Sequence, residues 1–185
     1  MWKATRIYLF LGLAILSGMV VSCDKEPGKT NAGEFTIDNT LYGFGPYYAI
    51  GYSFELGCEL KTSDSPPPDI TVHARTDAQG NVSGAYLDTP NLTESYALAR
   101  DFNTSAEAKD FFDNLLQVGT YTWVLFADGI SEYQVYIFKT REDNYVKFWI
   151  KNLVLDDTDD TADGAYAEVT IEWRIQPDGS PTFSK

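Results

Sequence analysis

The stretch that decides the fold runs from Tyr133 to Ile175 and reads YQVYIFKTREDNYVKFWIKNLVLDDTDDTADGAYAEVTIEWRI. It contains three runs rich in β-branched and aromatic residues, separated by polar residues, at 133–140, 145–155 and 165–175. In the last run, apolar residues occupy every second position from Ala167 onward, and mainly polar residues lie between them. Such alternation is typical of a strand with one buried and one solvated face. The stretch therefore predicts a three-stranded antiparallel meander.

Charge and burial together predict how the second and third of these strands pair. The second strand would point Val146, Phe148 and Ile150 inward and would carry on its outer face Tyr145, Lys147, Trp149 and Lys151. An antiparallel register brings opposite charges together in two pairs, Lys147 with Glu172 and Lys151 with Glu168. The same register stacks three apolar pairs, namely Phe148 with Ile171, Ile150 with Val169 and Val146 with Trp173. A slip of one residue would turn one apolar row outward, so we expect this pairing.

The rest of the chain continues the β pattern with one interruption. Further strands are predicted at 34–38, 49–61, 69–76, 82–87, 96–102 and 120–126. The sequence Thr104-Ser105-Ala106-Glu107 fits a helix-capping box, and an apolar stripe follows it, made of Ala108, Phe111, Phe112, Leu115 and Leu116. We therefore predict one short α-helix at about 105–117 that packs by its stripe against a sheet. The predicted fold class is mainly β, an antiparallel β-sandwich-like domain with one short α-helix.

The first 33 residues predict export and a lipid anchor. Lys3 and Arg6 precede the apolar run 7–21, a pattern typical of a secretory signal peptide and too short for a comfortable membrane span. The run ends in Val20-Val21-Ser22-Cys23, which is similar to a bacterial lipobox, so the Cys23 thiol would carry diacylglycerol. The alternative is an ordinary signal peptide followed by a chance cysteine. We expect three parts, a signal peptide at 1–22, a lipidated tether at 23–33 and one domain at 34–185.

The mature chain would be strongly acidic. Two of the 14 basic residues, Lys3 and Arg6, leave with the signal peptide, and the 12 that remain face 27 acidic ones, a net charge of −15. A surface of that sign repels the phosphates of nucleic acids and offers no basic face to anionic lipids. Composition thus excludes a nucleic-acid partner and leaves the lipid anchor as the predicted attachment to a membrane.

A cluster of glycines and aromatic residues lies at 41–48. Tyr42, Tyr47 and Tyr48 could line a ligand site, because the glycines between them would let backbone approach a ligand. The interpretation that we favour is instead a turn that packs as a lid on the edge of the domain. With Trp149 on an outer face, the same rings would make a stacking platform for a glycan.

His73 is the only histidine of the chain, and it lies beside Arg75 on the polar face of the strand at 69–76. This position fits a solvated strand residue better than a metal or heme ligand, although His73 is the one imidazole that could serve. Cys58 falls in an apolar row with Phe54 and Leu60. We expect Cys58 to be a buried free thiol that acts as a small hydrophobic residue, and no internal disulfide framework.

Carboxylates concentrate in residues 156–164. Asp157, Asp159 and Asp163 approach the oxygen spacing of a calcium loop, but Ala162 stands where the sharp turn needs glycine. The favoured interpretation is a solvated acidic hairpin loop, with calcium binding as the secondary one.

The carboxy-terminal residues carry a family resemblance. Tyr145-Val146-Lys147, the strand through Trp173, and Gln176-Pro177-Asp178-Gly179-Ser180 with Phe183 resemble the end of the HmuY-like family of Bacteroidota lipoproteins. The resemblance implies a β-rich outer-membrane lipoprotein, facing the periplasm or the cell surface, that captures heme between two axial His or Met side chains. Those ligand pairs are not matched, because Met1 and Met19 lie in the predicted signal peptide and His73 stands alone.

We therefore expect a non-catalytic binding lipoprotein for uptake of heme or a related flat ligand, working with an outer-membrane receptor. One axial group, His73 or a tyrosine, or ring stacking would hold the heme. The alternative is a glycan-binding accessory lipoprotein. We do not expect an enzyme, because the chain has one histidine and neither a Gly-x-Ser-x-Gly elbow nor a His-Glu-x-x-His pair.

Overall fold

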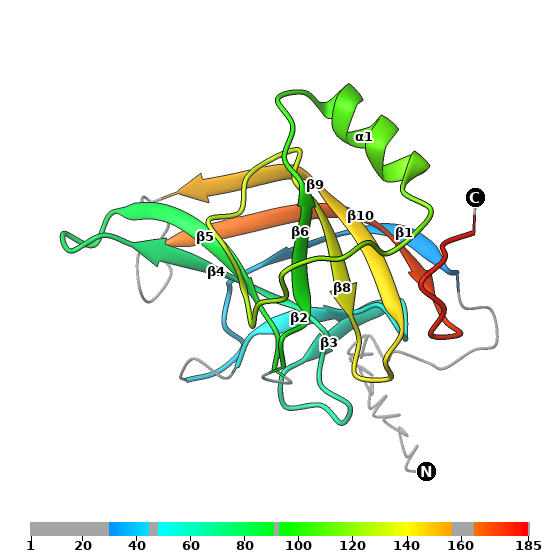
Figure 1. Ribbon diagram of the computed structural model, residues 1–185. Helices are drawn as coiled ribbons and strands as arrows, with labels where there is room; N and C mark the ends of the chain where they lie inside the picture. The colour runs from blue at the N-terminus through cyan, green and yellow to red at the C-terminus, as the bar shows by residue number, and fades with distance from the viewer. Residues whose placement is uncertain (1–29, 45–47, 91–92, 157–164, 185) are drawn as a thin grey trace, which may run out of the picture.

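The computed structural model describes residues 30–44, 48–90, 93–156 and 165–184. Ten strands and one helix lie in this part of the chain (Figure 1). The strands are β1 (Ala32–Asp38), β2 (Ile50–Ser53), β3 (Cys58–Lys61), β4 (Thr71–Thr76), β5 (Val82–Asp88), β6 (Tyr96–Arg100), β7 (Ala127–Asp128), β8 (Val135–Lys139), β9 (Tyr145–Asp156) and β10 (Tyr166–Gln176). The helix is α1 (Ser105–Asn114).

The largest sheet holds five antiparallel strands in the order β1-β10-β9-β8-β6. Its centre is the run β8, β9 and β10, so the predicted three-stranded meander is confirmed. Every second residue of β10 from Ala167 to Ile175 is buried, as the alternation of the sequence predicts. The apolar row of β9, made of Val146, Phe148 and Ile150, is fully buried as well.

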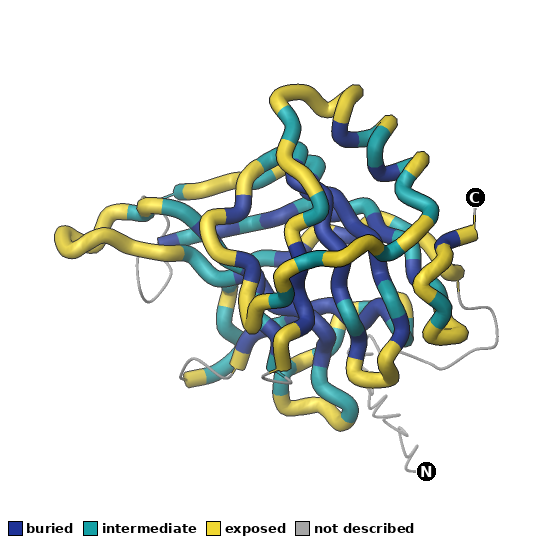
Figure 2. The backbone as a smooth tube through the Cα atoms, viewed as in Figure 1, coloured by how far each residue is buried: buried dark blue, intermediate teal, exposed yellow. Residues whose placement is uncertain are grey.

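A second layer covers the apolar face of this sheet. It consists of the three-stranded sheet β4-β5-β7 and the hairpin β2-β3 (Figure 1). The core between the layers is rich in aromatic rings, and the centroid of the Phe54 ring lies 5.5 Å from that of Trp173 and 5.6 Å from that of Phe138. Figure 2 shows the buried residues concentrated in the strands. The predicted fold class, a mainly β and antiparallel sandwich-like domain with one short helix, is confirmed.

The pairing of β9 with β10 is two residues away from the predicted register. Trp173 lies opposite Phe148, Ile171 lies opposite Ile150, and a bulge after Thr170 shifts the pairing further. A change of two residues keeps every side chain on its predicted face, so the apolar rows cannot distinguish the two registers. The predicted pairs Lys147–Glu172 and Lys151–Glu168 are wrong. Lys147 bonds to α1, and Lys151 pairs with Glu34 of β1.

The outer face of β9 is covered by α1 rather than by solvent. Lys147 is 0% exposed and Trp149 is 2% exposed, because Ala108 and Phe112 of the helix pack over this face. The prediction that the helix stripe packs against a sheet is therefore correct, and the prediction of a solvated outer face is wrong. Thr104 caps the helix as predicted, since its Oγ1 accepts the backbone N–H of Glu107 at 3.3 Å.

Two predicted strands take other forms. Residues 49–61 are a hairpin of β2 and β3, and Gly57 in its turn has a left-handed φ of 69° that favours glycine. Residues 120–126 are mostly irregular, and only Val124 makes a bridge, to Tyr96 of β6. In the described ranges no helix has the length and apolar character needed to cross a bilayer.

Candidate functional site

His73 lies on the outward face of the small sheet, in a row that runs across three strands. His73 of β4 is opposite Tyr86 of β5, and Tyr86 is opposite Asp128 of β7. The imidazole and the phenol ring are stacked, with centroids 5.1 Å apart and planes 21° from parallel. The row faces outward because the alternating residues of the same strands, among them Val72 and Leu87, fill the core.

Two further side chains complete this surface, which we call the His73 face and define as His73, Arg75, Tyr86, Phe126 and Asp128. The Phe126 ring, 43% exposed, meets the Tyr86 ring edge-on at 6.1 Å. The Arg75 guanidinium lies over the same Tyr86 ring at 5.5 Å and pairs with Asp128 at 2.7 Å. The His73 face thus combines an imidazole, two aromatic rings and a cation on one side of the sheet.

The surroundings of His73 favour the neutral form of its imidazole. It is half-buried, which differs from the solvated position that we predicted, and this burial lowers its pKa, although Asp88 opposes the shift. Its Nε2 lies 3.0 Å from Oγ1 of Thr71. In the tautomer that carries its proton on Nε2, this nitrogen donates to Thr71, and Nδ1 keeps a lone pair for a metal.

The aromatic cluster near residue 42 forms a separate edge. The rings of Tyr42 and Tyr48 meet edge-on at 5.4 Å, the Tyr42 hydroxyl donates to Ser63 at 2.8 Å, and Nζ of Lys61 lies 5.1 Å from the Tyr42 ring centre. A Cβ on Gly43 would lie only 2.7 Å from the Tyr48 ring, so the glycine is what lets that ring close over the turn. Tyr48 keeps 41% of its surface exposed. Tyr47 lies outside the described residues.

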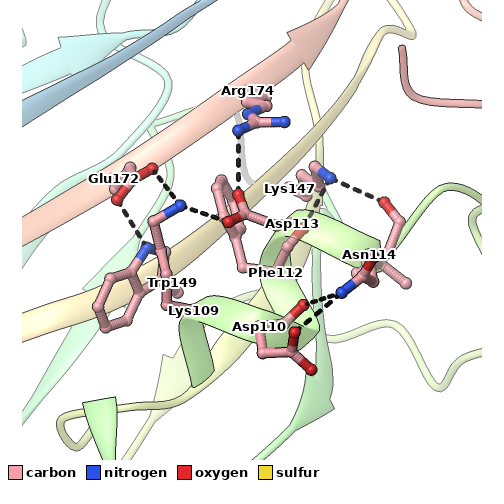
Figure 3. A network of polar contacts seen from close by, with 10 residues as sticks. Lys109, Asp110, Phe112, Asp113, Asn114, Lys147, Trp149, Glu172 and Arg174 are labelled. Carbon is pink, nitrogen blue, oxygen red and sulfur yellow. Dashed lines mark hydrogen bonds and ion pairs between the residues drawn. The ribbon is translucent and has the colours of Figure 1, made fainter. Parts of the chain in front are cut away.

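Trp149 does not join this edge. Its indole packs against Ala108 and Phe112 of α1, and its Nε1 donates to Oε2 of Glu172 at 3.1 Å (Figure 3). Nζ of Lys109 in the helix reaches the other carboxylate oxygen of Glu172 at 3.5 Å. A buried indole offers no face for stacking, so the expectation of an exposed Trp149 in a glycan platform is wrong.

A pocket of about 400 Å³ opens between the segment before β6 and the turn from β8 to β9. Residues 93–95 line one side of it, and Lys139, Thr140, Arg141 and Asp143 line the other. Of the described residues, neither His73 nor Tyr42, Phe44 or Tyr48 lines this pocket. No sequence motif indicated it, because its two sides become neighbours only through the pairing of β6 with β8.

Cys58 is not the buried free thiol that we predicted. It is half-exposed at the start of β3 and is disulfide-bonded, and its partner lies outside the described residues. The calcium candidates Asp157, Asp159 and Asp163 lie outside them too. In the part of the chain that the structure describes, no group of three or more His, Cys, Asp or Glu side chains could hold a metal ion.

Two residues of the His73 face could have been found from the sequence. Residues 77–81 separate the predicted strands 69–76 and 82–87, and pairing these strands antiparallel places Tyr86 close to His73, with Arg75 on the same face. Phe126 could not be found, because it comes from a segment predicted as a separate strand.

Neither a protein-family model nor a curated protein sequence matches this chain. The fold itself defines an antiparallel β-sandwich-like domain with a helix on one face. The resemblance to the HmuY-like family stays a prediction from the sequence.

Proposed function

We propose that this protein is a non-catalytic, lipid-anchored binding protein of the outer membrane or cell surface, and that its His73 face holds a flat, anionic ligand. Heme is the ligand class that the sequence favours. The observation that carries the proposal is the stacking of the His73 imidazole on Tyr86, with the Arg75 guanidinium over the same phenol ring and Phe126 exposed beside it. In the full proposal, an outer-membrane receptor would receive the ligand.

Each group of the His73 face has a defined task in this proposal. A neutral His73 would supply one nitrogen to the iron, because the chain has no second histidine and both methionines lie in the predicted signal peptide. The rings of Tyr86 and Phe126 would give apolar contact to the macrocycle. Arg75 would exchange its partner Asp128 for a propionate, which forms the same kind of charge-assisted hydrogen bond.

Hemin titrated into the purified protein at micromolar concentration tests the ligand. A saturable shift of the Soret band would support heme binding, and the absence of a shift would remove heme from the proposal. Iron-free protoporphyrin is the control ligand for hemin, because it keeps the ring and the propionates and lacks the metal. If His73 binds the iron, hemin will bind more tightly than protoporphyrin, whereas equal affinities would indicate stacking alone.

The second candidate function, glycan binding, is favoured by one observation, the pair of half-buried Tyr42 and exposed Tyr48 next to Lys61. Exposed tyrosines offer the apolar ring faces on which sugar rings pack. A glycan array probed with the wild type and with Tyr48→Ala tests this function. Binding that the variant loses would support it, and silence of the array with the wild type would dismiss it.

A further inference from the structure

The polar pocket beside the β8–β9 turn has a floor of buried hydroxyl groups. Ser95 is 3% exposed and Thr140 is 4% exposed, although both side chains line the pocket. The Thr140 hydroxyl donates to Glu55 at 2.7 Å, and the Ser95 hydroxyl lies 2.7 Å from that of Thr93. These hydrogen bonds hold the hydroxyls in place, so the floor offers fixed polar atoms.

The two sides of the pocket are held together by the backbone. The N–H of Lys139 donates to the carbonyl of Ser95 at 2.9 Å, which joins the end of β8 to the segment before β6. In the turn that follows, the N–H of Asp143 donates to Thr140, and Asp143 takes a left-handed φ of 62°. This conformation brings its carboxylate to 3.0 Å from Nζ of Lys139. Backbone hydrogen bonds therefore fix the two sides of the pocket relative to each other.

The charges around the pocket are balanced. Among the described residues, Lys139 and Arg141 supply two cations, Glu94 and Asp143 supply two anions, and the other lining side chains carry hydroxyl groups. Lys139 already pairs with Asp143 at 3.0 Å, and Arg141 donates to the carbonyl of Pro67 at 3.3 Å, so a ligand would share or exchange these contacts. A ligand with one charge would meet repulsion from one of these pairs, and an anion would also be opposed by the net charge of −13 of the chain. A ligand that carries both charges can satisfy both, with its carboxylate on the Arg141 fork and its ammonium near a carboxylate.

We propose that this pocket binds a small zwitterion with an α-ammonium and an α-carboxylate group, such as a free amino acid. A volume of about 400 Å³ falls in the range of small-molecule sites and suits a ligand of this size. The Thr140 hydroxyl, whose hydrogen goes to Glu55, would accept a hydrogen bond from the ammonium group, and the Ser95 hydroxyl would hydrogen-bond to either charged group. This inference does not depend on the His73 face, which shares no residue with the pocket.

Isothermal titration of the purified protein with a panel of free amino acids tests the inference. The matched probes are the N-acetyl derivative of the best binder, which lacks the ammonium group, and its amide, which lacks the carboxylate. Each derivative is expected to bind at least about tenfold more weakly, because it loses one of the two charge-assisted contacts of the zwitterion. Equal binding of all three forms, binding of monosaccharides instead, or no heat with any amino acid at millimolar concentration would overturn the inference.

Two substitutions in the pocket test the same inference through the preference for each charged group of the amino acid. Glu94→Gln should abolish the preference for the free ammonium over the N-acetyl group, and Arg141→Gln should abolish the preference for the carboxylate over the amide. Glu142→Gln is the matched control, since Glu142 is an exposed neighbour that does not line the pocket. His73→Ala should bind amino acids as the wild type does, so failure of heme binding and failure of this inference are distinguishable. Unchanged preferences in both pocket variants would contradict the assignment.

Discussion

Nζ of Lys147 lies 2.7 Å from the carbonyl oxygen of Phe112 and 2.9 Å from that of Leu115, so a fully buried lysine of the sheet holds the end of α1 (Figure 3). The last carbonyl groups of a helix have no partners within it, and a cation there also interacts favourably with the helix dipole. Burial opposes this arrangement, because it lowers the pKa of Lys147 to about 8. An ion pair of Arg174 with Asp113 at 3.0 Å supports the same attachment.

Replacing Lys147 by methionine should loosen α1. The two carbonyl oxygens would lose their donor, and we expect the free energy of unfolding to fall by about 1–3 kcal/mol. Hydrogen exchange should rise in α1 and stay slow in β9 and β10. Lys151→Met is the control, because Lys151 forms a partly exposed ion pair with Glu34 and should change stability little. An increase in the stability of Lys147→Met would show that the cost of burying the charge outweighs the hydrogen bonds.

The stability of the fold should depend on the protonation of Asp69. Burial raises the pKa of Asp69 from 3.8 to about 6, although its carboxylate accepts the N–H of Phe54 at 2.8 Å and the hydroxyl of Ser53 at 3.1 Å. The folded state therefore binds a proton more tightly than the unfolded chain does. This contribution is fully present below pH 3.8 and is lost as the pH rises through about 6.

Asp69→Asn provides the measurement, because asparagine has nearly the same shape and does not titrate. Between pH 4 and 7 the wild type should lose about 2–3 kcal/mol of unfolding free energy relative to the variant, at about 1.4 kcal/mol per pKa unit. Denaturant unfolding of both proteins across this range gives the difference. A constant difference would mean that Asp69 titrates normally in the folded protein.

Removing the Phe54 ring from the core should be costly. It is 1% exposed and packs against Trp173, Phe138 and Phe148, so Phe54→Ala should destabilise the protein by about 3–5 kcal/mol. Phe44→Ala makes the same chemical change at a ring that is 99% exposed and should have almost no effect. Thermal unfolding compares the two variants. Equal losses would contradict the packing described for Phe54.

The state of Cys58 should report whether Cys23 is lipidated. The chain has two cysteines, so a lipid thioether at Cys23 and a disulfide from Cys58 within the same chain exclude each other. Because we propose the lipid anchor, we predict that the disulfide of Cys58 is absent from the lipidated protein. Protein extracted from the membrane should carry acyl chains at Cys23, and unfolding should expose Cys58 as one reactive thiol. Mass spectrometry after thiol labelling measures both. An intact chain with unmodified Cys23 would refute the lipid anchor.

The sequence predicted the meander and its buried rows because alternation of apolar residues directly reflects which face is buried. It could not predict the pairing of β9 with β10, since two registers that differ by two residues bury the same rows. Lys147 and Trp149 were placed in solvent for a related reason. Alternation identifies two faces of a strand, and it does not tell whether a helix from elsewhere in the chain covers the second one.

The candidate site was predictable only in part. His73 stood out as the sole histidine, and pairing the predicted strands 69–76 and 82–87 would have placed Tyr86 close to it. The contribution of Phe126 depends on how an irregular segment crosses between the sheets, and no local pattern encodes that path. The polar pocket depends in the same way on a contact between residues more than 40 positions apart, Ser95 and Lys139.

Hemin affinity of the wild type and of His73→Ala tests the central claim most directly. The Soret titration is run in parallel on Tyr48→Ala, which removes an exposed ring outside the His73 face. We predict saturable binding by the wild type and by Tyr48→Ala, and binding at least about tenfold weaker by His73→Ala, because the iron loses its only imidazole ligand. Equal affinities of all three proteins, or no binding by the wild type, would contradict the assignment of heme to the His73 face.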